Sequence, residues 1–161
     1  MITPYERLAK RIRNEIPDME LVLERMQKAW QKSMEGSDAQ ELYLDSVALN
    51  LQSFYSGIER LFELIARYVD RSVPDGESWH RDLVQQMAQD IQDIRPAVIG
   101  ESSTIILDEL RKFRHVVVNI YTVNLVPEKM CKLVLSVNEL WPKLNGELMA
   151  FAEFLDEVSR E

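Results

Sequence analysis

The stretch from about residue 39 to residue 71 carries apolar residues at helical spacing almost without interruption. Such residues recur every three or four positions, a period that matches the turn of an α-helix and not the alternation of a half-buried strand. They are Leu44, Val47, Leu51, Phe54, Tyr55, Ile58, Leu61, Phe62, Ile65 and Val69. The pattern predicts one long helix, and a chain organised around it favours an all-α fold.

Further helices are expected on both sides of this stretch. The chain has only 5 Gly and 6 Pro in 161 residues, which leaves few turns for many short strands. The first helix should begin at Thr3, which with Glu6 forms a capping box, and should run to about residue 33. A second capping box is predicted at Asp38 and Glu41. Shorter helical patterns begin near residues 78 and 101–103, and a last one begins at residues 126–127 and runs, in two pieces, to about residue 158. About five helices are therefore predicted, in an up-and-down bundle.

The composition fits one globular domain over residues 1–161, because domains typically span about 100–200 residues. No apolar run is long enough to cross a membrane, and the first residues lack the apolar core of a signal peptide. The lone Cys131 cannot form an internal disulfide. These features predict a cytoplasmic protein. The formal charge of −8 argues against a general nucleic-acid binder, so any activity on RNA requires a local basic cleft or one formed by dimerisation.

Only two histidines, His80 and His115, can titrate near neutral pH without a perturbed environment. His80 lies three residues after Glu77, a spacing that places both side chains on one helix face. Carboxylate-bridged di-iron bundles need two such pairs and two further glutamates, and only this one pair is present. We therefore expect no metal and no other cofactor. The simpler interpretation of this segment is a helix start at which Trp79 packs into the core.

The segment from residue 110 to residue 121 is the most basic short stretch of this acidic chain. On a helix, Arg114 and Tyr121 fall nearly in line two turns apart, while His115 and Asn119 form the adjacent stripe. Together with Arg111 they gather cations, an imidazole, an amide and a phenol in one region. The residue pattern alone also fits a helix whose polar edge is simply solvated.

The same segment resembles the HepT-type ribonuclease toxins of the HEPN superfamily, which carry an arginine, four to six residues, a histidine, and usually a tyrosine two positions later. Arg114 and Tyr121 match the arginine and the tyrosine, and Asn119 stands where the histidine normally lies. The resemblance extends over most of the chain from about residue 40. It includes residues 44–51 and 54–62, Trp79-His80-Arg81-Asp82-Leu83, Arg95-Pro96, Phe113-Arg114-His115, residues 119–122, Leu125 with Pro127, and Leu140-Trp141-Pro142.

The resemblance implies a HEPN bundle, usually a homodimer whose motif helices line a shared cleft. It also implies metal-independent RNA cleavage and a MntA-type nucleotidyltransferase antitoxin that transfers AMP to the motif tyrosine, Tyr121. Asn119 departs from the family because an amide cannot exchange a proton, and Val118 departs because related sequences often have an arginine there.

On this basis Arg114 would clamp the phosphate, Arg111 would position the RNA backbone, and His115 would transfer protons in place of Asn119. Tyr121 would hydrogen-bond the phosphate or stack on a base. The alternative is a non-catalytic HEPN-fold partner that docks a nucleotidyltransferase.

Overall fold

The computed structural model describes residues 1–119 and 124–161. Its helices are α1 (Pro4–Ser33), α2 (Gln40–Ile65), α3 (Trp79–Met87), α4 (Glu101–Asn119) and α5 (Pro127–Ser159), and a π-helical turn, Ala66–Asp70, extends α2. The predicted all-α bundle of about five helices is confirmed. The last helix is one continuous element rather than two pieces, because Pro142 lies within α5 without ending it.

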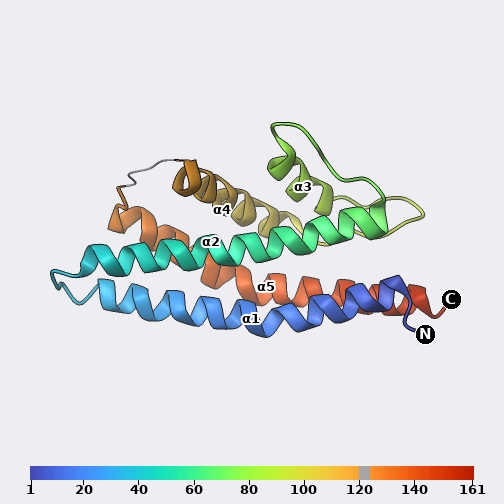
Figure 1. The fold of residues 1–161 in the computed structure, drawn as a ribbon, viewed down its shortest axis with the longest axis horizontal. Coiled ribbons are helices and arrows are strands. Elements are labelled where there is room, and N and C mark those ends of the chain that lie inside the picture. The colour runs from blue at the N-terminus through green and yellow to red at the C-terminus, as the bar shows by residue number, and fades with distance from the viewer. Residues whose placement is uncertain (120–123) are drawn as a thin grey trace.

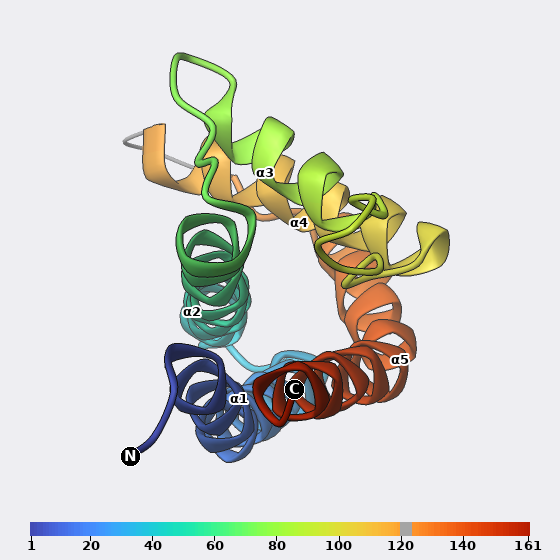
Figure 2. The ribbon, with the colours of Figure 1, turned by 90° about the vertical axis from the view of Figure 1, so that its right-hand side faces the viewer.

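Four of the helices form a ring in which each packs against two neighbours. Helix α1 contacts α2 and α5, and α4 contacts the same two helices from the other side. The chain direction alternates along α1, α2, α4 and α5 (Figure 1), and the end-on view shows the ring with α3 lying outside it (Figure 2). Helix α3 packs on both α2 and α4. The fold therefore brings one side of α2, the start of α3 and the C-terminal half of α4 to a common junction.

The core fills the centre of this ring. Helix α2 supplies several of its largest fully buried side chains, among them Phe54, Tyr55, Ile58 and Phe62. Burying each large apolar side chain stabilises the fold by about 1.5–3 kcal/mol relative to an exposed one. The apolar period that predicted α2 is thus the period of the core itself.

The two predicted capping boxes differ in outcome. At the start of α1, the Thr3 hydroxyl accepts from the Glu6 amide and the Glu6 carboxylate accepts from the Thr3 amide, both at 3.1 Å. The prediction at Asp38 is wrong, because α2 begins one residue later, with Ala39 at its N-cap and no side-chain cap. The Gln40 side-chain Nε2 instead donates to the Ser33 carbonyl at 3.0 Å, which ties the start of α2 to the end of α1.

A carboxylate from α5 fixes the start of α4. Glu147 accepts hydrogen bonds from the Gly100 amide and from the buried Ser103 hydroxyl. A Cβ added at Gly100 would lie 3.2 Å from the Glu147 carboxylate, tighter than an ordinary contact. Since this cap comes from 47 residues away, no local sequence pattern announces it.

The end of α2 is fixed by its π-helical turn and by a contact with the loop after α3. The π-helical turn closes with the Ser72 amide donating to the Ala66 carbonyl at 3.0 Å, and Arg71 adopts a left-handed backbone conformation with φ of 59°. The turn carries Asp70, whose carboxylate meets Arg95 from the loop after α3. Among the described residues, no helix is both long enough and apolar enough to cross a membrane.

Candidate nucleic-acid site at the α2–α3–α4 junction

Arg114 reaches from α4 to α2. Its side chain is half-buried, and its Nε donates to the Ser56 hydroxyl at 3.0 Å. Phe113, the preceding residue, packs against the core and so sets the direction in which Arg114 leaves the helix. The contact joins residues 58 positions apart. The contact anchors the predicted phosphate-binding arginine on α2.

Arg114 is exceptional among the partly or fully buried arginines that the structure describes. Arg13 and Arg111 are paired with carboxylates, and Arg95 engages all five of its N–H donors. Arg114 has the Ser56 hydroxyl as its one recorded partner within residues 1–119 and 124–161. A guanidinium held by a neutral group keeps its charge and its donor fork available for a phosphate.

The predicted RNA-binding residue Arg111 lies one turn before Arg114 and is already engaged. Its Nε donates to the Asp108 carboxylate at 2.8 Å, and Lys112 approaches the same carboxylate at 3.4 Å. Partial burial alone would raise the pKa of Asp108, but the hydrogen bonds and charges of Arg111 and Lys112 outweigh it and lower that pKa below its ordinary value. Part of the positive charge expected for RNA is therefore balanced within α4.

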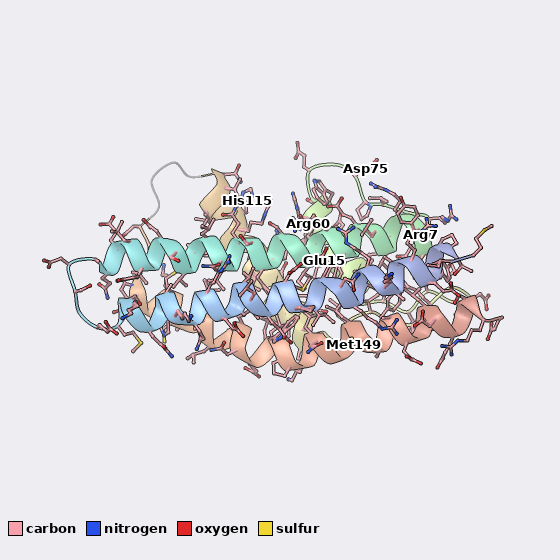
Figure 3. All side chains as sticks on the ribbon, turned by 60° about the horizontal axis from the view of Figure 1, so that its bottom comes forward. Arg7, Glu15, Arg60, Asp75, His115 and Met149 are labelled. Atoms are coloured by element: carbon pink, nitrogen blue, oxygen red, sulfur yellow. The ribbon has the colours of Figure 1, made fainter. Side chains whose placement is uncertain are left out.

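His115 lies on the exposed side of α4 (Figure 3), and Asn119 contacts it as their spacing predicted. The Asn119 amide nitrogen donates to the His115 backbone carbonyl at 2.8 Å and lies 3.1 Å from His115 Nδ1. The carbonyl fixes which end of the amide faces the ring, so Nδ1 must accept. His115 is then the neutral tautomer that carries its proton on Nε2.

Of the two remaining motif positions, the structure describes one. Tyr121, predicted to bind RNA and to accept AMP, lies outside the described residues. Val118 is 51% exposed, and Val116, on the opposite side of the helix, is 41% exposed. The last described turns of α4 therefore expose separate valines among the polar residues of the motif.

Sequence reasoning missed a second group of polar residues at this junction, on α2 and α3. The buried Glu59 carboxylate accepts a hydrogen bond from His80 Nδ1 at 2.7 Å. Tyr55, one turn before Glu59, has a buried hydroxyl that makes no hydrogen bond of standard geometry to any described residue. Burial first, then the Glu59 carboxylate, raise the pKa of Tyr55 far above its usual value, while the charges of Arg111 and Arg114 oppose the shift.

These residues define one site, which we call the junction cluster. Its members are Tyr55, Ser56 and Glu59 on α2, His80 on α3, and Arg111 and Arg114 on α4. A signal for it existed in the sequence, because Glu59 interrupts the apolar face of α2 with a charge, and buried charges require partners.

The Glu77–His80 pair does not form, since His80 turns to Glu59 instead. Trp79 packs against the core as expected, and its ring stacks on His80 with centroids 3.6 Å apart. Within the part of the chain that the structure describes, no group of three or more His, Cys, Asp or Glu side chains could hold a metal ion.

An up-and-down helical ring with an arginine-led polar motif on its fourth helix defines the class as HEPN-type. A family model described as HepT-like protein matches residues 46–155, which is most of the chain and includes the whole junction cluster. The chain therefore belongs to the HepT-like family of the HEPN superfamily, as its sequence motifs indicated. No curated protein and no solved structure matched it.

Proposed function

We propose that this protein is the toxin of a HepT/MntA-like toxin–antitoxin system and cleaves RNA in the cytoplasm without a metal ion. The observation that carries the proposal is the state of Arg114. It is half-buried, oriented by a neutral hydroxyl, and without a carboxylate partner among the described residues. A phosphodiester supplies the anionic partner that this guanidinium lacks.

RNA cleavage without metal requires a base for the 2′-hydroxyl, an acid for the leaving oxygen and cations around the phosphorane. Arg114 clamps the phosphate, and His115, the neighbouring residue on the exposed side of α4, transfers a proton. Arg111 positions the backbone once RNA phosphate competes with Asp108 for it. Asn119 takes part by orienting the His115 ring rather than by exchanging protons.

The charge balance supports an activity confined to this cluster. The chain carries −8 overall, so most of its surface repels RNA. We propose a homodimer in which the exposed Val118 of α4 faces the partner subunit. Such pairing would bring two copies of Arg111 and Arg114 toward one cleft and double its local positive charge.

Control of the toxin follows from the motif tyrosine. We propose that a MntA-like nucleotidyltransferase antitoxin transfers AMP to Tyr121. The added phosphate would place negative charge and bulk beside the position where RNA phosphate binds, and so would inhibit by repulsion and by steric blockage. Tyr121 also contacts RNA in the unmodified protein, through its hydroxyl or its ring.

A second candidate function rests on Asn119. Because its amide occupies His115 Nδ1, the one motif imidazole is held in a neutral state that is neither a strong acid nor a free base. A HEPN-fold partner that docks a nucleotidyltransferase without cleaving RNA would need neither a general acid nor a general base.

The deciding experiment measures cleavage of a single-stranded RNA by purified protein in the presence of a metal chelator, together with growth arrest on expression. Arg114→Ala should lower the cleavage rate by about 10²-fold or more, as expected for removal of a transition-state cation. Arg25→Ala, which removes an exposed arginine of α1, is the matched control and should cleave normally. Wild-type protein that binds the nucleotidyltransferase but leaves RNA intact would favour the second function.

A further inference from the structure

We propose that His80, held by Glu59, is the general base that accepts the 2′-hydroxyl proton, and that His115 protonates the leaving oxygen. The inference rests on the proposed ribonuclease function and supplies the second proton-transfer group that the motif of α4 lacks. It starts from the one carboxylate–imidazole pair of the junction cluster.

Glu59 and His80 have the geometry of an oriented imidazole. The Glu59 side chain is 7% exposed, and its Oε2 lies 2.7 Å from His80 Nδ1. A buried carboxylate is an acceptor, so Nδ1 carries the proton and Nε2 keeps the lone pair. Trp79 stacks on the ring and restricts its rotation. The His80 side chain remains 33% exposed, so part of the ring is accessible to a substrate.

This pair lies beside the phosphate clamp because both are anchored on one face of α2. Ser56, which holds Arg114, and Glu59, which holds His80, are three residues apart. Side chains at that spacing are neighbours, with Cβ atoms about 5–6 Å apart. The guanidinium and the imidazole thus reach the same helix face from α4 and from α3. Arg111 and Arg114 also lie near enough to Tyr55, the residue before Ser56, to affect its pKa.

The two histidines differ in tautomer, and the difference assigns their roles. His80 presents a lone pair on Nε2 because Glu59 takes the Nδ1 proton. His115 presents Nε2–H because Asn119 donates to Nδ1. The first can accept a proton. The second can donate one only as the imidazolium, which forms when a proton from solvent displaces the Asn119 amide from Nδ1.

The step balances as a transphosphorylation. His80 Nε2 takes the proton of the ribose 2′-hydroxyl while the 2′-oxygen forms a bond to phosphorus. The bond between phosphorus and the 5′-oxygen breaks, and that oxygen takes the Nε2 proton of the His115 imidazolium. The products are a 2′,3′-cyclic phosphate and a 5′-hydroxyl. His80 then releases a proton to water and His115 takes one up, which restores the starting state.

A substrate with sulfur in place of the bridging 5′-oxygen separates the two roles. Thiolate leaves without protonation, so this RNA needs a base but no acid. His80→Gln keeps an amide donor for Glu59 and should lower the rate at saturating RNA by about 10²–10⁴-fold on both substrates. His115→Ala should be impaired on normal RNA and restored to near the wild-type rate on the sulfur substrate.

Glu59 is a positioning residue, and its variant tests that role. Glu59→Gln should lower the rate at saturating RNA by about 10–100-fold, by analogy with groups that orient a metal-bound histidine, while KM stays unchanged. A merely structural loss would change the melting temperature and KM together. Arg81→Gln, which alters the exposed neighbour of His80, is the control and should keep the wild-type rate.

The outcomes separate the two proposals. Wild-type protein that cleaves neither substrate overturns the ribonuclease function, and the base assignment with it. An active wild type beside a folded, fully active His80→Gln variant overturns only the base assignment. So does restoration of His80→Gln by the sulfur substrate, because that result would make His80 the acid.

Discussion

Asp70 and Arg95 form a two-pronged ion pair with side-chain exposures of only 1% and 0%. Arg95 Nε lies 2.5 Å from one carboxylate oxygen, and Nη2 lies 2.8 Å from the other. Its remaining N–H groups donate to the carbonyls of Gln86, Gln89 and Pro96. The pair therefore ties the π-helical end of α2 to α3 and to the loop that leads into α4.

Breaking this pair should destabilise the fold strongly. Asp70→Asn leaves the Arg95 charge buried without its counter-ion, and we expect a loss of about 3–5 kcal/mol in the free energy of unfolding. Urea titration followed by circular dichroism measures it. Arg67→Gln, an exposed change on the same turn, should stay within about 0.5 kcal/mol. Equal, small effects for both variants would mean that the Asp70–Arg95 pair contributes little to the stability of the fold.

The Asp108 cluster should make stability weakly dependent on acid. Because the folded-state pKa of Asp108 is lowered, its contribution is fully present above the ordinary value of 3.8 and is lost as the pH falls through the lower, folded-state value. The effect should be small, since the carboxylate is 32% exposed and surface pairs are screened. Thermal melts of wild type and Asp108→Asn between about pH 6 and about pH 2 should converge at the acid end. A constant gap across that range would exclude the linkage.

Replacing Asn119 tests the departure from the family motif. Asn119→His restores an imidazole at that position and should raise the RNA cleavage rate by about 10²-fold, the lower end for a positioned acid–base group. Asn119→Ala is the matched control, because it frees His115 Nδ1 without adding an imidazole. If alanine gives the same gain, release of His115 explains it and the motif histidine does not.

Tyr121 provides the test of regulation. Incubation with ATP and a MntA-like nucleotidyltransferase should increase the intact mass of the wild-type protein by one or more AMP units and should abolish RNA cleavage. Tyr121→Phe should show neither the added mass nor the inhibition. Modification of the phenylalanine variant to the same extent would place the AMP on another residue.

The sequence predicted what depends on neighbouring positions. The apolar period of α2, the Thr3–Glu6 capping box and the approach of His115 to Asn119 all follow from spacing along a helix. The contacts that build the site are different in kind. Arg114 with Ser56 and Glu59 with His80 join residues from separate helices, and their pairing is decided only when the helices pack.

The predictions that failed have the same cause. Asp38 lies in a connection so short that Gln40 can reach the end of α1, so tertiary contact replaced the expected local cap. Glu77 lies before the start of α3 and so shares no helix face with His80, whose ring pairs with the buried Glu59 of α2. The sequence marked Arg95 only through the Arg95-Pro96 resemblance, yet it makes more hydrogen bonds than any other described arginine.

The ring of helices places residues 1 and 161 together at one end, while the outer end of α4 lies toward the opposite end (Figure 1). Whatever is joined to either terminus, an affinity tag, a fluorophore or a further domain, will project away from the motif. Labels for measuring RNA or partner binding can therefore be attached at both termini without obstructing the motif of α4.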